Sequence, residues 1–554
     1  MLYLCVLFCK KETMSSKKIE IPRKKVVFFL AALMWCCVSF AVPARRGWEQ
    51  HFSTDGTSVE LQQQGDECYH YWETRDGKLA LPLGNNLFEL TDANTPTPAQ
   101  VAARRAGSPY YTRDARKIGA INMAPRGLVI LVAYADLPYC AENTQSAIDS
   151  MMNHPGYSYN GATGSARDYF IAQSDSLYRP VFDVVGPVTL PHNRAYYGAN
   201  NSAGSDQNPA QMTVDACRLV DGEVDFTRYD NNNDGEIDFV YVLFAGIGEN
   251  DRNGEAEAIW PHNFYAGSKN CWLDGKKLNN YACSGEVDGL TGLRNGIGTL
   301  CHEFSHVLGL PDYYDTSSSG YNSTHILTPN DWSIMDYGCY NNGGNTPPNY
   351  SIFDKYFFGW ATPALLAEGA QLNVSLGTAY DEGYQINGGT TLLPYSTTQT
   401  VYYIENRQQQ GWDAYLPGHG MLVWQVKYNK SAWAGNTPNS TANDPRYTVV
   451  TADDDVKVGD YISDGVVYHE GKTDPFPGFA QVTSYTPFAN CALSDITETA
   501  GVISFLYNGG APTDQTDVES VQPSVTDVQK QFRNGQLMIV RDNKTYNAFG
   551  ILIQ

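Results

Sequence analysis

The chain has 554 residues, which is too long for one compact domain and predicts two to four domains. With 42% hydrophobic and 18% charged residues, its composition is that of a globular protein and excludes wholesale disorder. The net charge of -22 argues against nucleic acid or an anionic membrane as a partner, because their phosphate groups repel such a surface.

The first 41 residues differ from the rest of the chain. Basic residues precede the apolar run VVFFLAALMWCCVSFA, which is too short for a comfortable membrane span. Ser39 and Ala41 supply small side chains at the two positions that a signal peptidase needs. We therefore predict a signal peptide over residues 1–41, and a mature protein that is secreted or displayed at the cell surface without a stable membrane span.

Residues 42–115 are predicted to form a small unit of short antiparallel strands. In GTSVELQQQGDECYHYWETRDGKLALPLGNN, apolar and polar residues alternate between turn signals. The segment TPTPAQVAARRAGSP follows as a plausible linker. We interpret this unit as a propeptide.

An α/β domain is predicted over residues 116–365. The run GLVILVAYAD, residues 127–136, is typical of a strand buried on both faces, and SARDYFIAQS, residues 165–174, is typical of a helix. A second buried strand is predicted in DFVYVLFAG, which begins at Asp238.

The loop before that second strand carries oxygen-bearing side chains at alternate positions of the segment DNNNDGEID. These positions match an EF-hand-type loop, with Gly235 at the sharp turn. The match is partial, because Tyr241 stands where a bidentate glutamate is needed. We predict a structural calcium site here, with a solvated turn as the alternative. Its candidate ligands are Asp230, Asn232, Asp234, Glu236 and Asp238.

The segment GIGTLCHEFSHVLGLPDYYD predicts a zinc site on a helix. Residues four apart share one helix face, so His302 and His306 can direct two imidazoles at one ion while Glu303 reaches the same place. Two imidazoles and a third protein ligand leave one zinc position for water, which is the arrangement of a hydrolytic site. Glu303 is then the base that takes the proton of the water.

The residues after the helix supply the third ligand. Gly309 can take the positive φ that ends a helix, and Pro311 forbids its continuation. The chain therefore turns back and brings Asp312 within reach of the ion. Asp315 and His325 are alternative donors. A glutamate from a later helix is less favoured, because no Glu occurs between Glu303 and Glu368.

A methionine turn is predicted further along the chain, in SIMDYG. Met335 offers soft packing beneath the histidine rings. Tyr337, two residues later, could donate to the oxyanion of a tetrahedral intermediate.

The pattern HExxHxxGxxD followed by this turn resembles the metzincin metallopeptidases. The Asp312 variant, with LGLPDYYD, resembles the immune inhibitor A family of secreted bacterial zinc metallopeptidases. The likeness spans about residues 120–510 and includes FDVVGPVTL, IWPHNF, FGWATP and IENRQQQGWDAYLPGHGMLVWQV.

This resemblance implies a role for each matching position. It implies an α/β (α+β) metzincin-like zinc peptidase domain, with a small N-terminal prodomain and a β-rich C-terminal domain. The role of Tyr337 comes from related metzincins that share S-x-M-x-Y. The implied zinc ligands are His302, His306 and Asp312, with Glu303 as general base, Met335 in the methionine turn and Gly309 at the helix end.

Residues 366–510 are predicted to be rich in strands, in TVYYIENRQ, GMLVWQVKYN, YTVVTAD and GVISFLYNG. Residues 511–554 are predicted to be a polar linker and a short tail with two strand-like runs, GQLMIV and FGILIQ. The tail resembles C-terminal sorting signals of some secretion systems.

These observations predict a secreted zinc-dependent endopeptidase that acts on proteins or peptides and is inhibited by its own propeptide. The thiolate of Cys68 in that propeptide could cap the zinc until cleavage, but no local motif supports this role and a plain buried cysteine is favoured. The competing class is a non-catalytic adhesin or peptide-binding protein that keeps zinc for stability. The presence of Glu303 favours the enzyme, because a degenerate copy would most readily lose its base.

Overall fold

The computed structural model of the protein describes most of the chain, and residues 37–554 form one compact unit. The predicted signal peptide lies outside the described residues apart from its last two, which form strand β1 (Phe40–Ala41). The predicted linker 511–527 and the run FGILIQ also lie outside them. The described residues are 40–97, 100–101, 104, 124–202, 204–316, 328–379, 381–387, 399–441, 444–453, 461–463, 466–468, 471–510, 529–533, 536–541 and 544–547.

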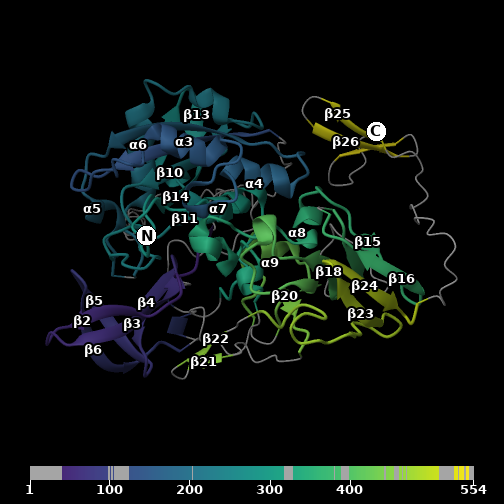
Figure 1. The fold of residues 1–554 in the computed structure, drawn as a ribbon. Helices are drawn as coiled ribbons and strands as arrows, with labels where there is room; N and C mark the ends of the chain where they lie inside the picture. Colours follow the sequence, from purple (N-terminus) through teal and green to yellow (C-terminus); the bar gives the residue numbers. More distant parts are fainter. Residues whose placement is uncertain are drawn as a thin grey trace, which may run out of the picture. The chain divides into compact units, whose positions relative to one another are not determined.

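A six-stranded sheet forms the centre of the first half of the chain (Figure 1). Four neighbouring strands are parallel, and an antiparallel pair completes one edge. The two apolar runs predicted as buried strands form two of the parallel strands. In spatial order the strands are β1 (Phe40–Ala41), β11 (His262–Tyr265), β14 (Asn280–Gly285), β10 (Val240–Phe244), β7 (Arg126–Ala133) and β8 (Val181–Thr189).

Helices cover both faces of this sheet, which explains why its strands are apolar on both sides. Alternate residues of β7 enter two separate cores. Val129 and Leu131 join the core that contains helix α7, whereas Ile130 joins the core on the opposite face with Met212. The helices of this region are α3 (Gln145–Asn153), α4 (Ala166–Gln173), α5 (Arg194–Gly198), α6 (Pro209–Val220), α7 (Gly298–Leu308) and α8 (Ile352–Phe357).

The predicted helix at SARDYFIAQS is α4, and the sequence explains its start. The Ser165 side chain accepts from the backbone N–H of Asp168, and the Asp168 carboxylate accepts from the Ser165 N–H. This reciprocal pair satisfies two N–H groups that a helix start otherwise leaves unpaired.

The N-terminal unit is a closed five-stranded barrel (Figure 1). Its small interior is built around Leu61, Trp72 and Phe88. The prediction of short antiparallel strands is confirmed, although β2 and β6 close the barrel with parallel pairing. The strands are β2 (Glu49–Ser53), β3 (Ser58–Asp66), β4 (Tyr69–Thr74), β5 (Lys78–Gly84) and β6 (Leu87–Asn94).

The second half of the chain contains two stacked sheets, antiparallel apart from the parallel pair β15 and β17, and its predicted richness in strands is confirmed. One sheet has five strands: β15 (Ala364–Leu365), β17 (Tyr384–Ile386), β18 (Val401–Arg407), β19 (Gly420–Val426) and β20 (Tyr447–Val450). The other has three strands: β16 (Leu372–Leu376), β24 (Val502–Tyr507) and β23 (Leu493–Thr499). A third core cluster, which includes Ile404, Val423 and Ile503, fills the space between them.

The outer face of the five-stranded sheet packs against helix α8. The ring of Phe353 on α8 lies 5.2 Å from that of Tyr403 and 5.6 Å from that of Tyr447, measured between centroids. The Glu405 carboxylate accepts from the backbone N–H of Ile352 at 2.9 Å. The core around α7 therefore continues across residue 365 into the strand-rich region.

The remaining described elements are short. The strands are β9 (Glu236–Ile237), β12 (Trp272–Leu273), β13 (Lys276–Leu278), β21 (Tyr461–Ser463), β22 (Val466–Tyr468), β25 (Gln529–Arg533), β26 (Gln536–Arg541) and β27 (Lys544–Asn547). The helical turns are η2 (Tyr159–Gly161), η3 (Phe226–Tyr229), η4 (Gly267–Lys269), η6 (Asn330–Trp332), η7 (Tyr337–Gly344), η8 (Gly411–Asp413) and the short helix α9 (Lys430–Ala434).

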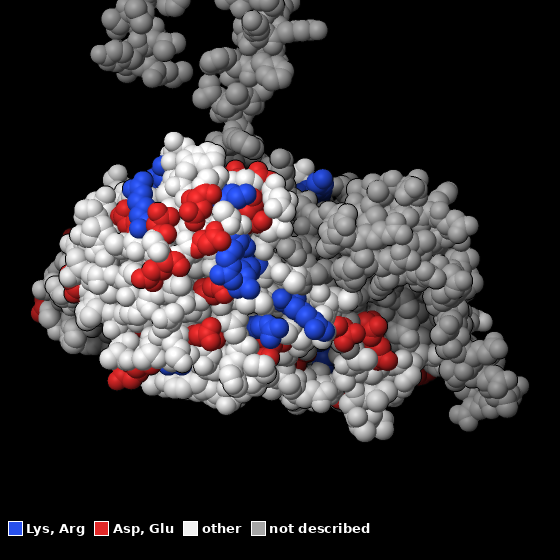
Figure 2. All heavy atoms as spheres, turned by 90° about the horizontal axis from the view of Figure 1, so that it is seen from above, with Lys and Arg blue, Asp and Glu red and all other residues white. Residues whose placement is uncertain are grey.

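Among the described residues, none of the helices combines the length and the apolar character that crossing a bilayer requires. On the face drawn in Figure 2, Lys and Arg side chains lie among Asp and Glu side chains.

Candidate metal centre

Helix α7 carries the HExxH segment, as predicted, and ends where the sequence indicates. Gly309 has φ of 107°, and its N–H donates to the His306 carbonyl at 3.0 Å. The N–H of Leu310 donates to the Ser305 carbonyl at 3.1 Å. These bonds satisfy carbonyls at the helix end, and the positive φ explains why glycine stands there.

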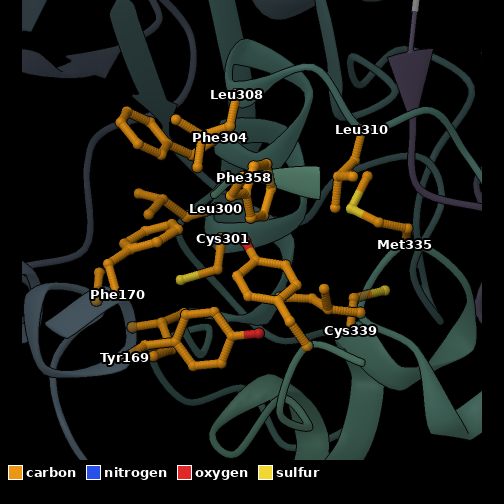
Figure 3. Close-up of a cluster of buried hydrophobic side chains, with 14 of the residues drawn as sticks. Tyr169, Phe170, Leu300, Cys301, Phe304, Leu308, Leu310, Met335, Cys339 and Phe358 are labelled. Atoms are coloured by element: carbon orange, nitrogen blue, oxygen red, sulfur yellow. The ribbon is translucent and has the colours of Figure 1, made fainter. Parts of the chain in front are cut away.

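Apolar packing fixes the position of α7. Figure 3 shows Leu300, Phe304 and Leu308 along one side of the helix. The Phe304 ring lies 5.0 Å from the ring of Phe170 on α4 and 4.7 Å from the ring of Phe239 beside the sheet. Because α7 is almost wholly buried, the histidine side chains have little freedom to move.

Backbone carbonyls fix which nitrogen of each histidine is available. The Nδ1 of His302 lies 2.7 Å from the Ile334 carbonyl, and the Nδ1 of His306 lies 2.8 Å from the Leu310 carbonyl. A carbonyl only accepts, so each Nδ1 carries the proton and each neutral ring keeps a lone pair on Nε2. This is the tautomer that a metal ligand needs.

The two Nε2 atoms and Asp312 converge on one point. The Nε2 atoms are 3.1 Å apart, and Asp312 Oδ1 lies 3.1 Å from that of His302 and 3.3 Å from that of His306. Ligands about 2.0 Å from a tetrahedral zinc are separated by about 3.3 Å. All three side chains are fully buried. The described residues therefore fit a zinc ion in both donor type and spacing.

The pKa values of His306 and Asp312 favour the forms in which these two residues bind a metal. Burial lowers the pKa of His306 to about 4, although Asp312 opposes the shift. Burial works against ionisation of Asp312, but His306 and His302 outweigh it and lower the pKa of that carboxyl well below its usual range. At neutral pH the site holds a neutral His306 and an ionised Asp312, whose charge a bound cation would balance.

Of the two candidates for the third ligand that the structure describes, Asp312 is the one that lies beside the histidines. Two groups of close donor atoms occur within the part of the chain that the structure describes: His302, His306 and Asp312, and Asp66, Glu67 and Cys68 at the barrel. Asp315 is buried but belongs to neither group. His325 lies outside the described residues.

A residue from the strand-rich region holds Asp312 in place. Asn436, which follows helix α9, donates from Nδ2 to Asp312 Oδ2 at 2.6 Å and accepts from the Asp312 N–H at 2.7 Å. Sequence reasoning missed this residue, because it lies 124 positions from its partner and no local motif marks it.

The predicted methionine turn lies beside the helix. Met335 is fully buried and lies next to Leu310 in Figure 3. The turn contributes through its backbone as well, because the Ile334 carbonyl accepts from His302 and the Met335 carbonyl accepts from the Tyr313 N–H at 2.8 Å. It therefore fixes both the first histidine and the loop that carries the third donor.

The two predicted catalytic side chains have different surroundings. Glu303 is fully buried on α7, immediately after His302. Tyr337 begins η7, and the guanidinium of Arg46 lies 3.4 Å from the centre of its ring. Arg46 also donates to Asn330 Oδ1. The segment before the barrel thus contacts the predicted oxyanion residue.

The predicted calcium loop is held by hydrogen bonds within the protein. Asp230 accepts from the N–H groups of Asp234 and Gly235 at 3.0 Å and from Lys276 Nζ at 2.6 Å. Asp238 accepts from the Asn231 N–H at 2.6 Å. These contacts are those of an Asx-rich turn, and calcium binding stays a prediction.

The described cysteines, which include Cys271 and Cys283, are free thiols. Strands β12 and β13 form an antiparallel hairpin between these two cysteines. The thiol of Cys68 lies 3.3 Å from a carboxylate oxygen of its neighbour Glu67.

Comparison with known proteins agrees with this geometry. A family model described as immune inhibitor A peptidase M6, catalytic domain, matches residues 133–361. Residues 133–361 belong to the immune inhibitor A peptidase family. This peptidase region contains all the candidate zinc ligands, Glu303, and the methionine turn.

The curated relatives of the chain are similar to it over only part of their length and of its own. The chain is 26% identical over 314 residues to "Immune inhibitor A" of Bacillus thuringiensis subsp. alesti, covering 48% of this chain and 42% of the relative. It is 29% identical over 275 residues to "Pre-pro-metalloprotease PrtV" of two Vibrio cholerae O1 strains, covering 42% of this chain and 29% of the relative. The chain therefore spans less than half the length of the curated relatives it matches.

Proposed function

We propose that this protein is a secreted zinc-dependent endopeptidase made as an inactive precursor. The observation that carries the proposal is the convergence of His302, His306 and Asp312 in a buried triangle of donors with the tautomers that a metal requires. The names of the relatives support the same activity, since two of them are called pre-pro-metalloproteases.

His302, His306 and Asp312 would hold the zinc. Bound there, zinc supplies Lewis acidity, which polarises a peptide carbonyl and lowers the pKa of water. Glu303 takes a proton from the attacking water and returns it to the leaving amine. Glu303 is fully buried beside the histidines. Surroundings of low dielectric suit a carboxylate that must both take up and release a proton during one reaction.

Tyr337 is proposed to donate to the oxyanion of the tetrahedral intermediate. The hydrogen-bonded turn supports its position, because Asp336 accepts from the Tyr337 N–H at 2.9 Å and from the Asn330 N–H at 2.8 Å. In the precursor its ring is covered by the Arg46 guanidinium.

The first residues of the propeptide, 42–48, are called here the precursor segment and are proposed to inhibit the peptidase by occupying the place of a substrate. Its main chain contacts the peptidase region, because the Val42 carbonyl accepts from Trp260 Nε1 and the Arg45 N–H donates to the Asn250 carbonyl. An extended substrate would be held through its backbone in the same way. Arg46 then covers Tyr337, so that substrate and precursor segment exclude one another.

The domain assignments follow from this proposal. Residues 1–41 are assigned as an export signal, 42–115 as the propeptide, 116–365 as a metzincin-like catalytic domain, 366–510 as a β-rich domain, and 511–554 as a linker and tail. The shared core between α8 and the five-stranded sheet favours a catalytic unit that includes the β-rich domain.

Zinc content and activity, measured together, test the proposal. The purified protein should contain one zinc per chain, and a casein zymogram should show a band that a chelator abolishes and added zinc restores. A protein with one zinc per chain and no casein cleavage after removal of the propeptide would instead be the non-catalytic binding protein. A protein without zinc would contradict both functions.

A further inference from the structure

The Arg45 side chain, which precedes Arg46, is buried against two carboxylates. Its Nη1 lies 2.7 Å from Asp251 Oδ1 and 2.5 Å from Asp288 Oδ2. The side chains of all three residues are at most 11% exposed. Asp251 and Asp288 belong to the peptidase region, whereas Arg45 belongs to the precursor segment.

The backbone of the peptidase region orients the two carboxylates. The other oxygen of Asp251 accepts from the Gly289 N–H at 2.9 Å. The other oxygen of Asp288 accepts from the N–H groups of Leu290 and Thr291 at 3.1 and 2.8 Å. One oxygen of each carboxylate is therefore fixed by a loop, and the second is presented to the guanidinium.

The chain that carries Arg45 is held through its main chain. The Val42 carbonyl accepts from Trp260 Nε1 at 2.9 Å, and the Pro43 carbonyl accepts from the Tyr340 hydroxyl at 2.6 Å. The Arg45 N–H donates to the Asn250 carbonyl at 2.8 Å.

Main-chain hydrogen bonds do not select a particular side chain, because every residue has a carbonyl and nearly every residue has an N–H. The buried ion pairs of Arg45 instead select one type of side chain.

Arg45 is the sequence neighbour of a residue that contacts the proposed catalytic site. The next residue, Arg46, stacks on Tyr337. A side chain next in sequence to the residue that covers the proposed oxyanion donor is in the position of a specificity residue of an extended substrate.

We propose that Asp251 and Asp288 form a subsite for an arginine or lysine side chain of protein substrates, and that Arg45 fills this subsite in the precursor. The inference rests on the proposed peptidase function and names its substrate class. When the precursor segment leaves, two oriented and largely buried carboxylates stay behind. A guanidinium or ammonium restores the lost ion pairs, whereas a neutral side chain leaves both charges unpaired.

The test compares matched peptides on the processed enzyme. The full chain is loaded with zinc and incubated until intact mass shows that the precursor segment has been removed. Cleavage sites in a digest of a model protein are mapped, and kcat/KM is measured for two peptides that differ only by Arg or Gln at the enriched position.

The Arg peptide should be cleaved with kcat/KM higher by about tenfold or more. Asp288→Asn and Asp251→Asn should each remove most of this preference. Asp183→Asn is the control, because Asp183 pairs with Arg126 at 2.5 Å in another part of the sheet and should leave the preference unchanged.

A second measurement needs no variant of the enzyme. The peptide VPARRGW, residues 42–48, should inhibit casein cleavage by the processed parent about tenfold more strongly than the same peptide with Gln in place of Arg45. Equal inhibition by the two peptides, or equal cleavage of the Arg and Gln substrates, would overturn the subsite while leaving the peptidase function intact. If the processed protein cleaves no casein, the peptidase function fails and the subsite fails with it.

Discussion

Asn436 holds Asp312 at two points, one through the carboxylate and one through the backbone N–H. The carboxylate is thereby oriented toward the Nε2 atoms of His302 and His306 by a residue of the strand-rich region. Support of this kind fixes the direction of a ligand lone pair and tunes metal affinity. The zinc site is therefore expected to depend on residues well beyond the HExxH helix.

Replacing Asn436 is expected to weaken zinc binding. Asn436→Ala should lower zinc affinity by about 10- to 100-fold, because the Asp312 carboxylate loses its orienting hydrogen bond. The measurement is zinc competition against a chelator of known affinity. Asn429→Ala is the matched control, since Asn429 caps the start of helix α9 and does not bind Asp312. Unchanged affinity in Asn436→Ala would contradict this role.

Removing Arg46 is expected to weaken latency. Arg46→Ala uncovers the Tyr337 ring, and the unprocessed precursor should cleave casein about threefold faster or more, which corresponds to the loss of one partly buried cation–π contact. Initial rates are measured while intact mass still shows the full precursor. Arg75→Ala, which removes a stacking contact on Trp48 at the barrel, should leave the rate unchanged. A precursor as inactive as the parent would show that Arg46 is not part of the block.

The contact between the barrel and the peptidase region is expected to weaken as pH rises. His70 on β4 lies 3.0 Å from a carboxylate oxygen of Glu249 and stacks on Trp260. Burial opposes protonation of His70, but Glu249 and Asp66 outweigh burial and raise its pKa above 6.5. Because the folded-state pKa is raised, the stabilisation is complete below the unfolded pKa and is lost as pH rises through the folded pKa.

Thermal unfolding of the parent and His70→Gln, measured from about pH 6 to about pH 9, tests this dependence. The stability difference between the two proteins should shrink as pH increases. Digestion of the barrel by an added protease should accelerate over the same range in the parent alone. A difference that stays constant with pH would mean that His70 does not gain a proton on folding.

The Asp230 loop gives the prediction for calcium. Calcium at about 1 mM should raise the midpoint of thermal unfolding, because a ligand that binds the folded state stabilises it. The shift should be larger in Lys276→Ala, in which Asp230 has lost its ammonium partner. Lys427→Ala is the control, because Lys427 pairs with Asp444 in the strand-rich region and not with a candidate calcium ligand. If neither the parent nor Lys276→Ala responds to calcium, the loop is only an Asx-rich turn.

Local chemistry explains which parts of the site the sequence could predict. The helix that carries His302 and His306, its end at Gly309 and the return of the chain at Asp312 depend on neighbours within a dozen residues. The structure confirms the helix and its end, and it brings Asp312 to the histidines. The two apolar strands β7 and β10 were equally predictable, because burial on both faces requires a continuous apolar run.

Contacts between distant segments explain what the sequence could not predict. Asn436 is 124 residues from Asp312, and Arg45 is 206 residues from Asp251. Nothing in the local pattern of either residue marks it, since a lone asparagine or arginine is usually solvated. Among the propeptide residues, sequence reasoning raised a zinc cap at Cys68 but favoured a plain buried cysteine there, and it did not name Arg46, which contacts Tyr337. Tertiary packing decides such pairings.

The comparison of parent and Glu303→Ala tests the central claim most directly. Both proteins are loaded with one zinc per chain, processed in the same way, and given unfolded casein. Because Glu303 moves the proton in the chemical step, the variant should keep its zinc and its fold and lose about 100- to 10,000-fold in cleavage rate. Cleavage by Glu303→Ala at the rate of the parent would contradict the account.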